Sequence, residues 1–481
     1  MSDARDTKGE TERAARGALH RTDSLVERAT RTAHEQNKTR RAEGKAMRRT
    51  VPRESHSQYQ VRPERPDPVA LLLSQDAVRI QSLLPIRFGR MAASPFSFYR
   101  GAAIVMANDL ATTPTTGWLA QACGDAHLEN FGGFGTEEGS LVFDVNDFDE
   151  TYPAPWEWDL KRLATSAVLA LRESGAKPAD QRAAAGAAAT GYRAAVRRLA
   201  DMGVMARWSA VVELPEALTL MGGSTTQIDK ATAAALKKTN VGAFPKLTQL
   251  VGGRRQIRER PPLVVRVTDD AELRTVRDGF ASYRETLRPE LRLLLDRFSL
   301  VDFARKVVGV GSVGMPAYVG LYLSADDDPL FLQFKLAVDP VIKPYVAVEG
   351  QPAHAGERVV VGQRLMQVAG DPLLGWTTGT DDQQFYVRQL RDMKLSFDVA
   401  TMKPSHAIKY VGMCAQVLAR AHSRTGDPAL VAGYLGGSDR SGAFEAAIIG
   451  FAQTYADQTE RDHAELVQAV KDGRVQAESG I

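Results

Sequence analysis

The stretch GDAHLENFG, from Gly124 to Gly132, brings an acid, an imidazole and an amide together in a loop bounded by glycines. It follows a mostly apolar run, GWLAQAC, and precedes a second apolar run that ends in acids, SLVFDVNDFDE. Apolar runs of this length, separated by turn residues, are typical of short strands. The pattern therefore predicts two strands that present a set of polar side chains at one edge: Asp125, His127, Asn130, Asp144, Asp147 and Asp149.

Several carboxylates close to one amide favour a divalent cation or phosphate chemistry. Hard cations such as Mg²⁺ take oxygen ligands, and one or two carboxylates together with substrate phosphates are a common ligand set. The stretch is therefore the first candidate for a functional site.

A second pattern lies further along the chain, in KVVGVGSVGMPAYVGLYL, where Gly309, Gly311 and Gly314 form a GxGxxG spacing. This spacing fits a dinucleotide-binding fold only if a helix follows the glycines directly. An alternating strand, AYVGLYL, follows instead, which favours a hairpin whose backbone amides can approach phosphates. The next predicted strand, LFLQFKLAV, places Lys335 among apolar residues, where a lysine needs a partner to stay charged.

The spacing D-x-H-x-x-N, with an apolar strand and another aspartate after it, resembles the catalytic and metal loops of aminoglycoside phosphotransferases and, more distantly, of protein kinases. The resemblance implies that Asp125 accepts the proton of the attacking hydroxyl and that Asn130 and Asp147 hold the metal. Asp144 is the alternative to Asp147. His127 is a second candidate for the catalytic site, where it either takes part in the reaction or stabilises the loop by hydrogen bonding.

The same resemblance gives roles to polar residues outside the loop. The glycine pattern and Lys335 would hold the phosphates of ATP, and a helix glutamate would orient the lysine. Glu357, at the start of the predicted helix GERVVVGQRLMQVAG, is the candidate for that glutamate, and Gln363 is the alternative. Asp159, near the start of the predicted helix PWEWDLKRLATSAVLALRESG, would brace the catalytic loop or simply favour the helix N-terminus. Arg100 would contact a phosphate or pair with an acid.

From about Arg65 onward the chain is also similar to the bacterial DUF2252 family, a set without an assigned function. The phrases that carry this similarity are RFGRMAASPFSFYRGAA, CGDAHLENFG, FDVNDFDE, PWEWDLKRLA, FYVRQLRDMK and LARAH. The similarity to phosphotransferases is shorter and lies inside this region.

In kinases the glycine loop and lysine precede the catalytic loop, whereas here they follow it. The resemblance therefore implies an α+β, two-lobed, kinase-like fold that is circularly permuted, which is tolerated when the joined ends lie close together at the surface. We expect a disordered basic tail over 1–66 and a large-lobe part with the catalytic and metal loops over 67–240. A linker and helix over 241–300, a small lobe over 301–395 and a helical remainder of the large lobe over 396–481 would follow.

Composition sets wider bounds. A net charge of +3 over 481 residues is too small to imply nucleic acid. The cysteines, Cys123 and Cys414, lack metal spacing, which favours a reducing compartment. With no secretory signal and no apolar run of about 18 residues, no membrane span is expected and the cytoplasm is the expected location. The first 66 residues hold few large apolar side chains to offset the entropy of ordering.

We therefore predict an ATP- and Mg²⁺-dependent phosphotransferase. Its acceptor hydroxyl is left open between a small molecule and a protein, and its oligomeric state is left open as well. One alternative is a nucleotide-binding protein that keeps the fold without turnover. A metallophosphoesterase is the other, although such enzymes need further histidines in loops. No GxSxG elbow supports a Ser-His hydrolase.

Overall fold

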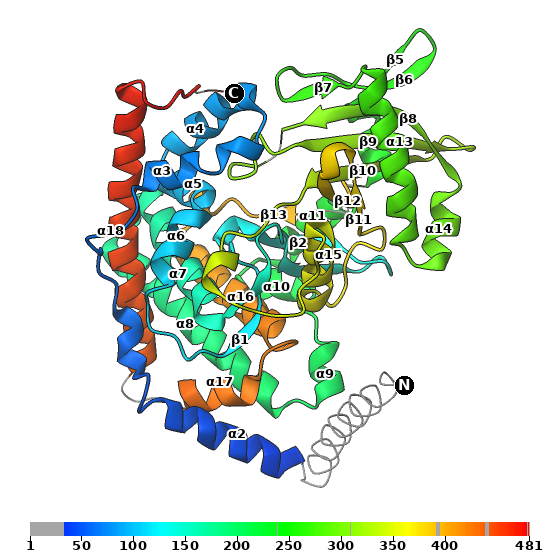
Figure 1. The fold of residues 1–481 in the computed structure, drawn as a ribbon. Helices are drawn as coiled ribbons and strands as arrows, with labels where there is room; N and C mark the ends of the chain where they lie inside the picture. Colours follow the sequence, from blue (N-terminus) through cyan, green and yellow to red (C-terminus); the bar gives the residue numbers. More distant parts are fainter. Residues whose placement is uncertain are drawn as a thin grey trace, which may run out of the picture.

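The computed structural model describes residues 33–237, 239–307, 309–390, 395–437, 442–478 and 480, which form a mixed α+β fold (Figure 1). The helices are α2 (Ala33–Met47), α3 (Pro68–Leu73), α4 (Leu84–Ala92), α5 (Pro95–Gly101), α6 (Ala103–Leu110), α7 (Trp156–Glu173), α8 (Pro178–Asp201), α9 (Val204–Trp208), α10 (Leu214–Leu220), α11 (Thr225–Leu236), α12 (Asn240–Leu247), α13 (Asp270–Glu285), α14 (Pro289–Leu295), α15 (Ala355–Met366), α16 (Pro404–His422), α17 (Pro428–Leu435) and α18 (Ala443–Lys471). The strands are β1 (Leu119–Ala122), β2 (Phe131–Gly135), β3 (Leu141–Val145), β4 (Tyr152–Pro155), β5 (Thr248–Val251), β6 (Arg254–Ile257), β7 (Val264–Arg266), β8 (Phe298–Lys306), β9 (Ala317–Ser324), β10 (Pro329–Leu336), β11 (Gly375–Thr378), β12 (Gln384–Gln389) and β13 (Leu395–Ser396).

The largest sheet is antiparallel and has the order β11-β12-β10-β9-β8-β7. Strands β8, β9 and β10 follow one another as a meander; the chain then passes through α15 and returns as β11 and β12, with β12 beside β10. Lys335 on β10 lies opposite Ala317 of β9 and Tyr386 of β12. The sequence prediction that a strand follows the glycine pattern is therefore confirmed.

Both faces of this sheet are covered. Leu332 and Phe334 of β10 pack with Tyr283 of α13 on one face, and Phe331 packs with residues of α12 and β6 on the other. This follows from the side-chain period of two along a strand. Helix α13 ends at Glu285 and α14 begins at Pro289, because a proline fits the first turn of a helix but not its interior.

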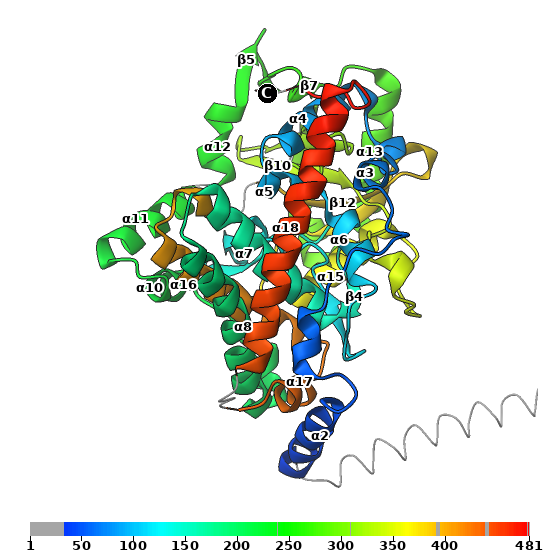
Figure 2. The same cartoon turned by 90° about the vertical axis from the view of Figure 1, so that its left-hand side faces the viewer.

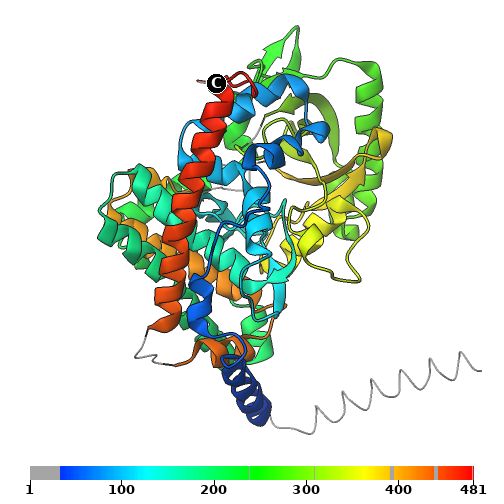
Figure 3. The ribbon, with the colours of Figure 1, turned by 60° about the vertical axis from the view of Figure 1, so that its left-hand side comes forward.

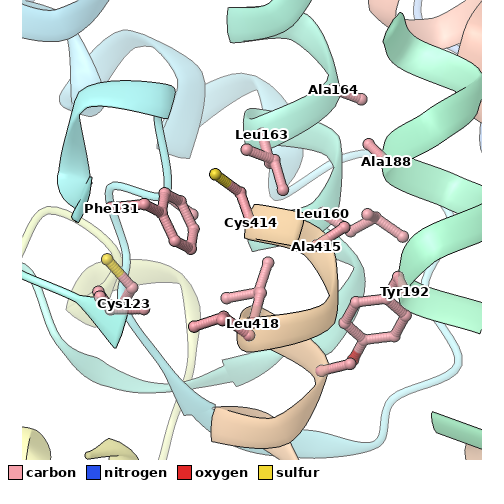
Figure 4. Packing of buried hydrophobic residues seen from close by; sticks show 14 of the residues in the cluster. Cys123, Phe131, Leu160, Leu163, Ala164, Ala188, Tyr192, Cys414, Ala415 and Leu418 are labelled. Carbon is pink, nitrogen blue, oxygen red and sulfur yellow. The ribbon is translucent and has the colours of Figure 1, made fainter. Parts of the chain in front are cut away.

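The helical part of the molecule has its core where α16 passes between α7 and α8. Cys414, Ala415 and Leu418 of α16 lie among the side chains of α7 and α8 (Figure 4). A Cβ atom at Gly191 of α8 would lie 2.5 Å from the carbonyl oxygen of Gly412 on α16, so the two helices cross at close range through glycines. Both cysteines are buried free thiols.

Helix α18 runs along the outside of this helical body and contacts α7, α8, α3 and α5 (Figures 2 and 3). Arg65 fixes the chain that leads into α3, because its guanidinium bonds to the buried carboxylates of Asp109 and Asp462 at 2.9 and 2.6 Å. No helix in the described part of the chain is both long enough and apolar enough to cross a bilayer.

The expected disordered tail over 1–66 is wrong for residues 33–66. Helix α2 packs against α17, where a Cβ atom at Gly44 would lie 2.0 Å from the carbonyl oxygen of Leu430. Arg48 donates from Nε to the carbonyl of Tyr434 at 2.7 Å and from Nη2 to the carbonyl of Gly433 at 2.6 Å. Close contacts at glycines and arginine-to-carbonyl hydrogen bonds hold this segment. A prediction of disorder from the scarcity of apolar residues therefore fails here. Residues 1–32 lie outside the described residues.

The expected linker within 241–300 is also incorrect. Residues 248–257 form the β5–β6 hairpin, and β7 pairs with β8 at the edge of the large sheet. Gly252 and Gly253 both have positive φ, 55° and 78°, as a two-residue hairpin turn requires. The GG dipeptide between two short strands was the signal for this hairpin.

Candidate functional site

A cavity of about 350 Å³ lies where the loop of residues 124–132 faces the loop between β8 and β9. It brings together three residues expected at the site, Asp125, Asn130 and Asp147, with Gly311 from the glycine pattern. Its remaining lining residues come from four segments and from the stretch that follows β3: Ser74, Gln75, Val78, Arg79, Arg100, Gly101, Ala103, Ile104, Asp149, Glu150, Ser312, Met315, Leu336, Ala337, Val338, Asp339, Pro340, Val341, Lys343, Pro344 and Tyr345.

Asp125 is held from behind by Arg162 of α7. The Nε atom of Arg162 donates to Oδ1 of Asp125 at 2.6 Å, and its Nη2 atom donates to the carbonyl of Tyr99 at 3.0 Å. Burial raises the pKa of the Asp125 carboxyl, while the positive charge of Arg162 opposes part of that rise. This arrangement fixes one carboxylate oxygen and leaves Oδ2 as the atom that can accept a proton.

Asp159 braces the same loop, as the sequence predicted. Its carboxylate accepts hydrogen bonds from the backbone N–H groups of Cys123, at 2.7 Å, and Gly124, at 3.0 Å. His422 bonds to the same carboxylate through Nε2 at 3.1 Å and to the hydroxyl of Tyr192 through Nδ1 at 2.9 Å. His422 is buried and links the Asp159 carboxylate to Tyr192 within the interior.

Asn130 is oriented by its own loop. Its Nδ2 atom donates to the backbone carbonyl of Asp125 at 2.7 Å, which leaves Oδ1 as the oxygen that would reach a cation. Asp147 lines the same cavity. The described residues contain no cluster of three or more His, Cys, Asp or Glu side chains arranged to hold a metal. One carboxylate and one amide oxygen fit Mg²⁺ that takes further oxygens from phosphates, and do not fit a cation held by protein alone.

Asp144, the alternative metal ligand, is not brought to the cavity. It is buried on β3 and forms an ion pair with the guanidinium of Arg420 from α16. Because successive strand residues point to opposite faces, Asp144 faces α16 and the interior. Of these two aspartates, Asp147 is the one that lines the cavity.

His127 does not line the cavity, which favours the second of its two expected roles, stabilising the loop. The ring is buried, and its Nε2 atom lies 3.7 Å from Oδ2 of Asp125. Burial and the charges of Arg100 and Arg162 hold the pKa of His127 well below its usual value, so the ring is neutral. Its backbone shapes the loop, since its N–H donates to the carbonyl of Asp125 at 2.8 Å.

Lys335 is paired with acids that follow β3. Its Nζ atom lies 2.5 Å from Oδ2 of Asp149 and 3.9 Å from Oδ2 of Asp147. Tyr386 donates its hydroxyl to Oδ1 of Asp149 at 2.6 Å. Burial by itself would raise the pKa of Asp149, but the Lys335 charge and these hydrogen bonds lower it to about 2. The lysine and Asp149 are therefore both charged at neutral pH.

The expected pairing of Lys335 with Glu357 or Gln363 is wrong. The side chain that α15 directs toward this region is Arg358, which donates to the backbone carbonyls of Thr151, Asp149 and Val338 at 2.5 to 2.9 Å. Gln363 donates to Gln367 at 2.9 Å. Arg358, the residue after Glu357, thus anchors the acidic segment by bonding to that segment's backbone carbonyls. The negative charge that Lys335 needs comes from Asp149.

The glycine pattern forms a tight loop between β8 and β9. Gly309 and Gly314 have positive φ, 69° and 84°, which explains the glycines there, and Gly311 lines the cavity. Ser312, within the pattern, donates its hydroxyl to Oδ2 of Asp149 at 3.4 Å. Arg79 donates from Nη1 to the carbonyls of Gly311 and Val313 at 2.9 and 2.5 Å, so the loop is fastened to the segment before α4.

Glu150 adds a second unusual carboxyl to the cavity. Its Oε2 atom accepts the N–H of Val341 at 2.7 Å. Burial is the largest influence and raises the pKa of Glu150 to about 7, although Val341 and Arg358 act in the opposite direction. Glu150 therefore changes its charge near neutral pH while it holds the segment after β10.

Several residues of the site were missed or left undecided. Asp149 was seen as one of several acids, but nothing local singled it out as the partner of Lys335. Arg162 reads as an ordinary residue of an amphipathic helix, and Arg79 lies in a segment with no motif. Arg100 was left open between a phosphate and an acid, and it pairs with Glu129 at 2.5 Å while lining the cavity.

Comparisons with known proteins give a family and no activity. No curated protein matches the chain, and no solved structure matches it. One family model, described as "Uncharacterized protein conserved in bacteria (DUF2252)", matches residues 79–469, a span that contains every residue of the cavity except those between Ser74 and Val78. Because the match covers most of the chain, the protein belongs to the DUF2252 family.

Proposed function

We propose that this protein is an ATP- and Mg²⁺-dependent phosphotransferase built on a circularly permuted, kinase-like, two-lobed fold, and that it phosphorylates a hydroxyl group. The observation that carries the proposal is the convergence of two distant sequence patterns on one cavity. Asp125, Asn130 and Asp147 come from the first pattern, Gly311 comes from the second, and Lys335 lies next to Asp147. A protein without catalytic activity would have no chemical need for this combination of side chains in one cavity.

The arrangement of the sheet supports the permuted fold. The lysine lies on the third strand of a meander whose first turn is the glycine loop, and α15 and two more strands follow. The resemblance to phosphotransferases implies this order of glycine loop, lysine strand and helix within the small lobe. The aspartate that braces the catalytic loop supports it as well, since Asp159 accepts the N–H groups of Cys123 and Gly124.

Each side chain then has a distinct task. Asp125, fixed at Oδ1 by Arg162, would take the proton of the acceptor hydroxyl at Oδ2. Its raised pKa favours this role, because a base with a higher pKa accepts a proton more readily. Asn130 and Asp147 would hold Mg²⁺, and Lys335 would move from Asp149 toward a phosphate oxygen. Bound ATP with Mg²⁺ would supply the phosphoryl group that is transferred.

Calorimetric titration with ATP, with and without Mg²⁺, tests the binding step without a known acceptor. We expect Mg²⁺ to strengthen binding and Asp147→Asn and Lys335→Ala to weaken it. Asp144→Asn is the matched control: it changes an aspartate of the same segment that faces Arg420, so a folded variant should keep the Mg²⁺ dependence. Asp125→Asn should still bind nucleotide and should lose about a hundred- to ten-thousand-fold in the rate of transfer. Folded wild type that binds no ATP would reject the proposal.

The alternative is a nucleotide-binding protein without turnover. The ion pair between Lys335 and Asp149 favours this alternative. The pair engages the ammonium group of Lys335, and Asp149 takes the place of the helix glutamate that the resemblance implies. The two proposals differ in one result: ATP binding that Asp147→Asn weakens, together with no transfer to any acceptor or to water, would support the alternative.

A further inference from the structure

Two guanidinium groups line the cavity at the tip of the glycine loop and are only partly used by the protein. Arg79 follows a short 3₁₀ turn before α4, and Arg100 lies in the last turn of α5. Both line the cavity with Gly311 and Ser312. The loop tip touches α5 directly, since a Cβ atom at Gly311 would lie 3.1 Å from the carbonyl oxygen of Arg100.

Arg79 is a largely buried cation whose hydrogen bonds go to carbonyl groups. Its Nη1 atom serves Gly311 and Val313, and its buried Nε atom has no hydrogen-bond partner among the described residues. The nearest acids act on it only at longer range, and one of them, Asp76, already bonds to Arg87 at 2.8 Å. A buried charge without a bonded counter-ion is costly, so this position favours an anion.

Arg100 is used in part. Its Nη2 atom pairs with Oε2 of Glu129 at 2.5 Å, and its Nε atom is buried without a partner in the described part of the chain. Two acids of the cavity are already bonded to other cations. Asp125 is bonded to Arg162, and Asp149 is bonded to Lys335. Among the described residues each guanidinium thus keeps an Nε–H donor without a partner near the loop tip, and guanidinium groups suit phosphate and carboxylate groups.

We propose that Arg79 and Arg100 form an oxyanion subsite at the tip of the glycine loop, which takes a phosphate or carboxylate group of a ligand. The inference rests on the proposed function for the source of that group. The group is either the terminal phosphate of the nucleotide or an anionic group of the acceptor. In the second case the acceptor is a small anionic alcohol, because the cavity volume suits a small ligand.

Titrations with three probes separate these sources: ATP with Mg²⁺, ADP with Mg²⁺, and inorganic phosphate alone. If the terminal phosphate occupies the subsite, Arg79→Gln and Arg100→Gln should each weaken ATP binding about tenfold or more and leave ADP binding unchanged. If the acceptor's anion occupies it, both variants should weaken binding of inorganic phosphate and leave both nucleotides unchanged.

Arg90→Gln is the matched control. Arg90 also fastens the glycine loop, by donating to the carbonyl of Gly309 at 2.6 Å, but it does not line the cavity. It should change none of the three affinities. Arg79→Lys separates loop fastening from anion binding, because it keeps a charge and a donor and should recover part of the lost affinity.

The outcomes distinguish this inference from the proposed function. Wild type that binds inorganic phosphate through both arginines, but not ATP, would keep the subsite and reject the phosphotransferase. Wild type that binds ATP with Mg²⁺, together with folded Arg79→Gln and Arg100→Gln proteins that bind all three probes as wild type does, would reject the subsite alone. Wild type that binds none of the probes would overturn both.

Discussion

The Nζ atom of Lys335 lies 2.5 Å from Oδ2 of Asp149, and this contact joins the large sheet to the acidic segment that follows β3. The side chain of Lys335 is only 4% exposed, and that of Asp149 is 28% exposed. Because the lysine is buried, its charge depends on this partner, and the aspartate in turn depends on the lysine.

Replacing Lys335 by methionine should therefore destabilise the protein as well as weaken nucleotide binding. The change leaves the Asp149 carboxylate with the hydroxyls of Tyr386 and Ser312 as its side-chain donors. Removing one partner of a buried pair typically costs about 3 kcal/mol or more, so the free energy of unfolding in urea should fall by roughly that amount.

Two further variants interpret this result. Lys343→Met is the control, because Lys343 pairs with Asp339 at the surface and such pairs contribute about 1 kcal/mol or less. Asp149→Asn added to Lys335→Met should restore part of the lost stability, since no unpaired charge remains. Equal losses of unfolding free energy for Lys335→Met and Lys343→Met would show that the buried pair stabilises the protein no more than a surface pair does.

Glu150 should make stability depend on pH in a window between about 4.5 and about 7. The pKa of its carboxyl is raised from 4.5 to about 7 in the folded protein. As pH rises through this window the unfolded chain loses the Glu150 proton first, so stability falls with increasing pH. Glu150→Gln cannot ionise and should be more stable than wild type at about pH 8, by on the order of 1 to 3 kcal/mol.

Denaturant unfolding at both ends of the window measures this difference. The advantage of Glu150→Gln should be nearly lost at about pH 4.5, where the folded wild-type carboxyl is protonated and the unfolded one is half-ionised. Glu137→Gln is the control, since Glu137 is an exposed partner of Arg288. An advantage of Glu150→Gln that is equal at the two pH values would contradict the assigned pKa.

The part of the site that the sequence predicts is the part that is local. Asp125, Asn130 and Asp147 lie within one strand, loop and strand unit, so alternation and loop composition were enough to place them together. The bracing role of Asp159 was one of two roles considered, and it was implied by the resemblance to phosphotransferases. These positions depend on short-range geometry, which a sequence pattern records.

The pairings between distant segments could not be predicted in the same way. Lys335 and Asp149 are 186 positions apart, and several other acids were equally plausible partners. Asp144 lies within β3, opposite Gly132 of β2, and pairs with Arg420, whereas Asp147 lies beyond the end of that strand. Helix α2 was missed because glycines and arginine-to-carbonyl bonds hold it, and these leave no apolar pattern.

Asp159 provides a test of how the loop of residues 124–132 is held. Asp159→Asn keeps one acceptor for Cys123 and Gly124 but places an amide N–H₂ group where a second acceptor is needed. Loss of a buried, charged hydrogen-bond acceptor costs about 2 to 3 kcal/mol, and we expect that loss in urea unfolding. Glu173→Gln, at the other end of α7, is the control because Glu173 is exposed and accepts only from Ser94 among the described hydrogen bonds. Similar losses of unfolding free energy for the two variants would show that Asp159 does not brace the loop.

Gly44 tests the contact that orders the N-terminal segment. In an exposed helix, Gly→Ala stabilises by up to about 1 kcal/mol, because alanine has the higher helix propensity. At Gly44 the added Cβ would meet the carbonyl oxygen of Leu430 at 2.0 Å, so α2 and α17 would have to separate. We therefore expect Gly44→Ala to destabilise the protein by about 1 to 3 kcal/mol, the usual cost of overpacking.

Gly450→Ala in α18 is the control. Its Cβ would have only an ordinary contact with Ser57, at 3.5 Å, so this variant should be neutral or stabilising. Thermal unfolding of both variants measures the difference. A Gly44→Ala protein as stable as the Gly450→Ala protein would mean that α2 does not rest on α17 in solution.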